Sequence, residues 1–159
     1  MAKSNYDRLI ELVTEVFDVK NDPEQLDVDE HVLEKMHRIH PATREQRDDE
    51  NGPIAWLLVI PTTKKVMEQF ICKEITEQQL YEQTNPGDRF DAIYLCSAIV
   101  LPEYRNKGIA RAMTEDAVKA IMKDHTITAL YVWPFSSEGD ALARKVANDM
   151  HLPLLTRTA

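Results

Sequence analysis

The order of apolar runs along the chain predicts an α/β (α+β) fold. The run from Ala92 to Val100 has no charged residue and is rich in strand-forming side chains, which is typical of a strand covered on both faces. A basic loop follows it, and from about Ile109 the apolar residues recur at helical spacing. The runs Ile54 to Ile60 and Ile127 to Val132 predict two further strands, the second of them beside 92–100.

The length and charge of the chain restrict its class. Its 159 residues predict a single domain, 1–159, that is large enough to bury a core. A net charge of −8 argues against a nucleic-acid binder, which needs a basic face. No apolar run reaches membrane-spanning length, and the opening MAKSNYDR is not typical of a signal peptide. We therefore expect no membrane partner. Cys72 and Cys96 lack metal-ligand spacing, so we interpret both as reduced thiols of a cytoplasmic protein.

Two helices are predicted ahead of the first strong strand. Ser4 or Asn5 is the predicted N-cap of a helix that runs to about Val19. A second helix is predicted from about Asp27 to His40, with acidic residues in its first turn, where the helix dipole favours them.

The second helix carries four side chains of metal-ligating type, each three residues from the next. They are His31, Glu34, His37 and His40. Steps of three residues rotate by about 60° each and wind around a helix. We therefore interpret the four as a solvated polar face and predict no metal site.

The stretch between the second helix and the strand 92–100 is less regular. The segment from Pro41 to Pro53 is polar and charged, and we interpret it as a loop with a turn at Asn51-Gly52. The segment from Thr62 to Ile71 fits either a strand or a helix.

Three weaker elements complete the prediction. A short helix over 75–83 has Thr76 as its N-cap and Gln79 as the capping-box partner. A helix is predicted from about Asp140 to Met150, and Leu154-Leu155 forms a weak final strand.

The loop after the strand 92–100 has the properties of an anion-binding site. The first backbone N–H groups of a helix have no helical partner and point at whatever lies before the helix. Arg105, Lys107 and Arg111 add three positive charges to an otherwise acidic chain. The simplest ligand is a phosphate or pyrophosphate. The spacing matches neither a P-loop nor a dinucleotide fingerprint, so both of those classes are excluded.

The residues of this loop stand in the pattern Val100-x-Pro102-x-x-Arg105-x-x-Gly108-x-Ala110. The pattern resembles the acyl-CoA-binding motif of the GNAT superfamily, the CoA-dependent N-acyltransferases, and the likeness covers about residues 92–135. It implies a mixed central sheet with helices on both faces. It also implies that the fourth strand, here 92–100, parts from the next strand at Val100. The family's third strand would fall near 62–71, and we find no strand ahead of the first helix.

The resemblance implies an N-acetyltransferase with acetyl-CoA as co-substrate. The acceptor is a primary amine of a small molecule or peptide, which attacks the thioester directly in a ternary complex. In the family, backbone near the motif's valine polarises the carbonyl, and the loop N–H groups hold the pyrophosphate. Ser136 and Ser137 lie where the family's asparagine often contacts the cofactor. The implied cofactor-binding residues are Val100, Arg105, Asn106, Lys107, Gly108, Ile109, Ala110, Arg111 and Ser137.

The last helix departs from the family pattern. If Ala143 is the family's alanine, Asp140 replaces an asparagine and His151-Leu152 replaces Gly-Phe. Ala147 then stands where the family usually has the tyrosine that protonates the departing thiolate. We leave the acid open among five candidates: Tyr94, Tyr104, Ser136, Ser137 and solvent.

The catalytic residues are not assigned from the sequence. Tyr94 is interpreted as a core residue and Tyr104 as loop surface, and neither Glu103 nor Asp91 is chosen as the general base. The alternative function is a CoA-binding regulatory or structural module with little or no turnover. The missing tyrosine favours this alternative, whereas the intact loop favours the enzyme. A homodimer is left open.

Overall fold

A computed structural model describes residues 3–17, 26 and 28–158 of the chain. It contains a five-stranded sheet in the order β1-β2-β3-β4-β5. The strands are β1 (Arg44–Asp49), β2 (Gly52–Thr62), β3 (Ala92–Val100), β4 (Ala129–Val132) and β5 (Leu154–Thr156). The pairs β1/β2 and β2/β3 are antiparallel, whereas β3/β4 and β4/β5 are parallel. The predicted mixed sheet is therefore confirmed.

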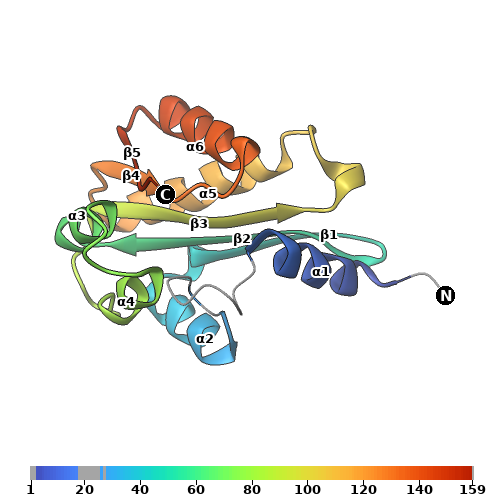
Figure 1. Ribbon diagram of the computed structural model, residues 1–159, viewed down its shortest axis with the longest axis horizontal. Coiled ribbons are helices and arrows are strands. Elements are labelled where there is room, and N and C mark those ends of the chain that lie inside the picture. The colour runs from blue at the N-terminus through green and yellow to red at the C-terminus, as the bar shows by residue number, and fades with distance from the viewer. Residues whose placement is uncertain (1–2, 18–25, 27, 159) are drawn as a thin grey trace.

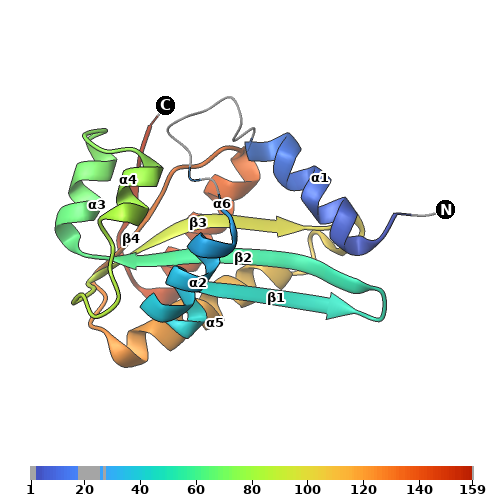
Figure 2. The ribbon, with the colours of Figure 1, turned by 90° about the horizontal axis from the view of Figure 1, so that it is seen from below.

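Helices cover both faces of this sheet. They are α1 (Asn5–Phe17), α2 (Glu30–Ile39), α3 (Lys64–Ile71), α4 (Glu77–Glu82), α5 (Ile109–Asp124) and α6 (Ser137–Met150), with short 3₁₀ turns η2 (Pro41–Thr43) and η3 (Pro102–Tyr104). Figure 1 shows α5 and α6 on one side of the sheet and α1, α2 and α4 on the other. In Figure 2, α2 lies in front of β1 and β2. Among the helices of the described residues, none is long and apolar enough to cross a membrane.

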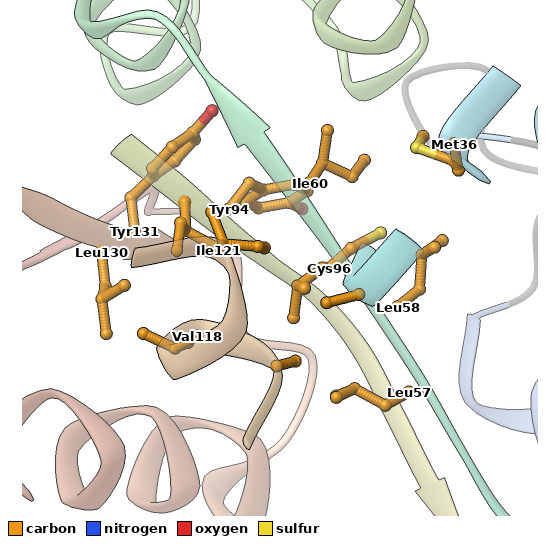
Figure 3. Packing of buried hydrophobic residues seen from close by; sticks show 14 of the residues in the cluster. Met36, Leu57, Leu58, Ile60, Tyr94, Cys96, Val118, Ile121, Leu130 and Tyr131 are labelled. Atoms are coloured by element: carbon orange, nitrogen blue, oxygen red, sulfur yellow. The ribbon is translucent and has the colours of Figure 1, made fainter. Parts of the chain in front are cut away.

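The core is built on both faces of β3. The rings of Tyr94 and Tyr131 stack with their centroids 5.1 Å apart, and Phe70 packs edge-on against Tyr94 at 4.9 Å. Val118 and Ile121 of α5 cover the strands from the opposite side (Figure 3). The prediction of Tyr94 as a core residue is confirmed, since its side chain is fully buried.

Several local predictions are confirmed by the hydrogen bonds of the helix caps. Ser4 Oγ accepts from the Asp7 N–H at 3.1 Å and so caps α1. Thr76 and Gln79 form the predicted capping box at the start of α4. The end predicted at Val19 and the start predicted at Asp27 lie outside the described residues. The helix α2 begins at Glu30, one residue after its N-cap.

The segment predicted as a polar loop contains a strand, β1. Its side chains alternate between exposed and half-buried, but they are polar on both faces, so no apolar period reveals them. Pairing with β2 defines it instead, and charged side chains suit a strand at the edge of a sheet. The predicted turn at Asn51-Gly52 is present and becomes the hairpin between the two strands.

Of the two alternatives left open for 62–71, the helix is present: Lys64–Ile71 is α3, and the family's third strand, which the resemblance placed near here, does not lie in this segment. The Thr63 hydroxyl accepts from the Val66 N–H at 3.3 Å and starts this helix. Val66, Met67 and Phe70 then lie on its buried face. The last helix begins at Ser137 rather than Asp140, because the Ser136 hydroxyl caps it. No strand precedes α1 within the described residues.

One residue of the predicted polar face on α2 is buried. His31, Glu34 and His37 are exposed, but His40 is only 6% exposed. Its Nδ1 accepts from the Ala42 N–H at 3.0 Å, so its Nε2–H donates to Asp124 Oδ2 at 2.7 Å. His40 is thus a structural link between η2 and the end of α5. In the described part of the chain, no group of three or more His, Cys, Asp or Glu side chains is arranged to hold a metal ion.

Candidate functional site

The pairing of β3 with β4 ends partway along β3. Their parallel pairing runs from Ala92 opposite Ala129 to Leu95 opposite Val132, and β3 continues alone on that side to Val100. The separation was predicted, but at Val100 rather than after Leu95. The strand β4 is short because its pairing ends just before Trp133-Pro134, and proline has no N–H for a ladder.

A bulge in β3 coincides with this separation. On the β2 side, Leu58 pairs with Ser97 and Val59 with Leu95, so Cys96 is the extra residue of β3. The thiol of Cys96 is buried and that of Cys72 is exposed, and both are free, as predicted.

The loop after β3 is held in an unusual backbone conformation. Asn106 has φ 63° and Gly108 has φ 77° with ψ 11°, so both are left-handed. The side chain of Arg105 folds back, and its Nε donates to the Val100 carbonyl at 3.1 Å. Glycine adopts this backbone at little cost, which explains why the sequence has one directly before α5.

The start of α5 leaves backbone donors without partners. Gly108 is the N-cap and has no side chain to cap the helix. The first helical hydrogen bond is from the Ala112 N–H to the Gly108 carbonyl at 3.0 Å. Within the described residues no acceptor is found for the N–H groups of residues 106–111. This is the donor arrangement that binds anionic groups at helix N-termini.

The three basic residues singled out from the sequence make different contacts. Arg105 and Lys107 are exposed, and the Lys107 ammonium lies 5.6 Å from the ring centre of Tyr104. Arg111 instead points along the helix pair α5/α6, where its Nε donates to Asp149 Oδ2 at 2.8 Å. The positive charge nearest the free N–H groups therefore comes from the loop itself.

A pocket of about 290 Å³ opens beside this loop. Its wall is formed on one side by the β1–β2 hairpin and on the other by the first residues of α5: Arg47, Asp48, Ile54, Lys107, Gly108 and Ile109. Gly108 therefore borders open space, and a Cβ placed on it would meet no atom within 4 Å.

The helices α5 and α6 start at the same edge of the sheet, because each follows one of two adjacent parallel strands. Ser136 Oγ accepts from the Gly139 N–H at 3.0 Å and is used as the helix cap. Ser137 is exposed in the first turn, and its hydroxyl donates to Glu138 at 3.4 Å. Of the two serines considered from the sequence, Ser137 is the one whose hydroxyl is not used as the cap.

A polar cluster ties the loop to α1 and to the hairpin. Asp49 accepts hydrogen bonds from the Tyr104 hydroxyl at 2.6 Å, the Asn5 amide at 2.9 Å and the Asn51 N–H at 2.7 Å. Arg8 donates two hydrogen bonds to Glu103, at 2.8 and 2.6 Å. Both polar residues of η3 are thus anchored immediately before the loop.

Neither carboxylate considered from the sequence is suited to be a general base. The Arg8 guanidinium lowers the pKa of Glu103 to about 2, so this group is a very weak base. Asp91 lies just before β3, at the far end from the loop, where it lines a separate pocket of about 590 Å³.

The structure reveals a buried carboxylate that sequence reasoning missed. Glu77, the first residue of α4, is 5% exposed. It accepts from the Tyr94 hydroxyl at 2.5 Å and from the Leu26 N–H at 2.6 Å. Cys96, on the same strand as Tyr94, has its sulfur 3.8 Å from the same carboxylate. In the sequence Glu77 lies in the polar stretch TEQQ, and nothing there distinguishes it from a solvated residue.

The position aligned with the family's tyrosine offers no hydroxyl. Ala147 is 4% exposed on the inner face of α6. The hydroxyls of Tyr94, Tyr104 and Tyr131 are bonded to Glu77, Asp49 and Thr62 respectively. The acid that protonates the thiolate therefore stays unassigned.

A mixed sheet, a parallel strand pair whose ladder ends partway along β3, and a loop with unpaired backbone N–H groups before α5 are the features that point to a class of protein. The sequence profile of the acetyltransferase (GNAT) family matches residues 22–144, which is more than half of the chain. The chain belongs to this family, and as a member it is an acetyltransferase. Comparison with curated proteins gives no match.

A solved structure with some likeness is the apo form of the aminoglycoside antibiotic 6'-N-acetyltransferase AAC(6')-IG from Acinetobacter haemolyticus. It is 15% identical with a TM-score of 0.47, and the match covers 92% of this chain and 86% of that one. This distant likeness carries no argument about the substrate.

Proposed function

We propose that this protein transfers an acetyl group from acetyl-CoA to a primary amine of a small molecule or peptide. The reaction is a direct attack of the amine on the thioester in a ternary complex. The observation that carries the proposal is the separation of β3 from β4 after Leu95, directly before a loop with unpaired N–H groups. An extended thioester arm fits between separated strands, and a diphosphate fits a helix N-terminus.

The residues proposed to bind the coenzyme are those of the loop and the two helix starts: Val100, Arg105, Asn106, Lys107, Gly108, Ile109, Ala110, Arg111 and Ser137. The N–H groups from Asn106 to Arg111 hold the diphosphate, and Arg105 and Lys107 add charge. Backbone near Val100 polarises the thioester carbonyl and stabilises the oxyanion. Positioning the amine and the thioester together supplies the remaining acceleration.

Coenzyme binding is tested by placing tryptophan at Gly108. The side chain of Gly108→Trp would fill the space in front of the helix start, so we expect CoA binding to be lost in calorimetric titration. Gly87→Trp is the matched control: Gly87 has φ 88°, also has no atom within 4 Å of a built Cβ, and lies in a remote turn. The backbone strain is then similar in both variants, so their melting temperatures should fall alike. CoA affinity retained in Gly108→Trp would refute the assignment of the loop.

Turnover is tested by thiol release from acetyl-CoA with a panel of primary amines. We expect thiol release that depends on one class of amine and yields its acetamide. Binding of CoA without thiol release for any amine would instead support the CoA-binding module with little turnover.

A further inference from the structure

The carboxylate of Glu77 is placed where buried charge is costly. Only 5% of the surface of Glu77 is exposed. Burial raises its pKa, and the hydrogen bonds from Tyr94 and Leu26 only partly offset that effect. A carboxylate with raised proton affinity accepts a proton near neutral pH more readily than an ordinary one does.

The groups around Glu77 come from three separate parts of the chain. Tyr94 and Cys96 face it from β3, the Leu26 N–H from the segment before α2, and Arg157 from the end of the chain. Arg157 is itself buried, stacked 4.4 Å from the ring centre of Phe70 and donating to the Ile75 carbonyl at 2.9 Å. Its positive charge lowers the pKa of Glu77 less than the other groups do.

The cluster lies at the separation of the strands. Tyr94 is paired with Tyr131 in the last part of the β3/β4 ladder, and Cys96 is the first residue of β3 beyond it. Figure 3 shows Tyr94 and Cys96 on β3, with Tyr131 close to Tyr94. In the proposed reaction the thioester carbon lies where the β3/β4 ladder ends. Glu77 is the described carboxylate that is hydrogen-bonded to this part of β3.

We propose that Glu77, acting through the Tyr94 hydroxyl, accepts the proton that the amine loses when it attacks acetyl-CoA. This inference rests on the proposed function. As the N–C bond forms and the C–S bond breaks, the amine proton passes to the Tyr94 oxygen while Tyr94 gives its own proton to Glu77. The Glu77 carboxylic acid then returns that proton to the CoA thiolate or to solvent. The amine does not have to reach Glu77 itself, because Tyr94 relays the proton to it. Both side chains are buried.

The inference is tested with Glu77→Gln, which keeps the shape and removes the base. With the best amine of the panel we expect kcat to fall by about 10²-fold or more. The CoA affinity and the melting temperature of Glu77→Gln should show that the fold and the proposed coenzyme site are retained. The acid limb of the wild-type profile of kcat/KM against pH, which reports protonation of Glu77, should be absent. Glu82→Gln is the matched control, because Glu82 is an exposed glutamate on the same helix.

Tyr94→Phe is a second variant that keeps the carboxylate and the aromatic ring. Losing the hydroxyl removes a bond that lowers the pKa of Glu77, so the acid limb should move to higher pH and kcat should fall. This variant decides the matter if Glu77→Gln does not fold.

The outcomes separate the two proposals. If the wild type is active, and Glu77→Gln or Tyr94→Phe keeps both its kcat and its acid limb, the role of Glu77 is overturned. The proposed function is not affected by that result. Wild type that binds CoA but releases no thiol overturns the proposed function, and this inference with it.

Discussion

Two tyrosine–carboxylate pairs among the described residues are nearly identical in their hydrogen bonds. Tyr94 donates to Glu77 at 2.5 Å, and Tyr104 donates to Asp49 at 2.6 Å. Each carboxylate also accepts a backbone N–H, at 2.6 Å in the first pair and 2.7 Å in the second. Even so, the pKa of Glu77 is raised, whereas the pKa of Asp49 is lowered.

The difference between the two pKa shifts comes from the hydration of the carboxylates. Glu77 is buried, and the loss of hydration outweighs what its hydrogen bonds return to the charged form. Asp49 remains half-buried at the edge of the sheet, so the bonds from Tyr104 and Asn51 determine its pKa. The same bonds therefore accompany a raised pKa at Glu77 in the interior and a lowered pKa at Asp49 beside the loop before α5.

The largest expected effect is on the buried pair. Tyr94→Phe leaves a buried carboxylate with one hydrogen bond fewer, so we expect about 1–3 kcal/mol of lost stability at pH 7 in urea unfolding. The loss should shrink as the pH falls through the folded pKa of Glu77, which is raised above its ordinary value, because the carboxyl then becomes protonated in both proteins. Tyr131→Phe is the control: its hydroxyl is equally buried but bonds the neutral Thr62, so its loss should not vary over this pH range. Equal pH dependence in both variants would contradict the comparison.

The second effect concerns the pH dependence of stability. Because the folded pKa of Glu77 lies above its unfolded value of about 4.5, the unfolded state releases this proton first as pH rises. Stability is therefore lost from about pH 4.5 upwards until the folded pKa is passed, by about 1.4 kcal/mol for each pH unit that separates the folded pKa from the unfolded one. Glu77→Gln should flatten that part of the curve in denaturant titrations at several pH values. A curve that keeps its slope would mean that Glu77 is not desolvated.

A smaller effect is expected for the half-buried pair of Tyr104 and Asp49. In Tyr104→Phe, Asp49 keeps its bonds to Asn5 and Asn51 and regains water, so the melting temperature should fall less than in Tyr94→Phe. Because η3 loses one of its anchors, CoA affinity should weaken modestly in calorimetric titration, without a change in kcat. A fall as large as that of Tyr94→Phe would refute the role assigned to hydration.

The smallest effect is expected for Glu103→Gln. The Arg8 hydrogen bond lowers the pKa of Glu103 to about 2, so its contribution is present above pH 4.5 and is lost as pH falls toward 2. The melting difference from wild type should be small at pH 7, because the pair is exposed, and smaller still at pH 3. The double variant with Arg8→Gln measures the pairwise part, and a difference that grows on acidification would contradict the sign.

The strand–loop–helix unit around Gly108 was predictable because its signals are local. A strand with no charge, a proline, a left-handed glycine and a helical period all stand within residues 92–121, so their order along the chain is enough to place them. The capping box at Thr76 and the turn at Asn51-Gly52 were predictable for the same reason.

Elements that depend on partners elsewhere in the chain were missed. The strand β1 carries no apolar period, and only its ladder with β2 makes it a strand. His40 follows the same helical pattern as three exposed neighbours, yet it is buried and forms a hydrogen bond with Asp124 at the end of α5. Glu77 looks like one more polar residue until Tyr94 and Leu26 are brought to it.

By itself, the sequence determined the family and the central strand–loop–helix unit, because each depends on neighbouring residues and backbone geometry. Only the tertiary structure decided where the pairing of β3 with β4 ends, and which carboxylate is desolvated beside that point. Desolvation is the physical reason, since the pKa of a side chain depends on everything packed around it and not on the residues next to it in the chain.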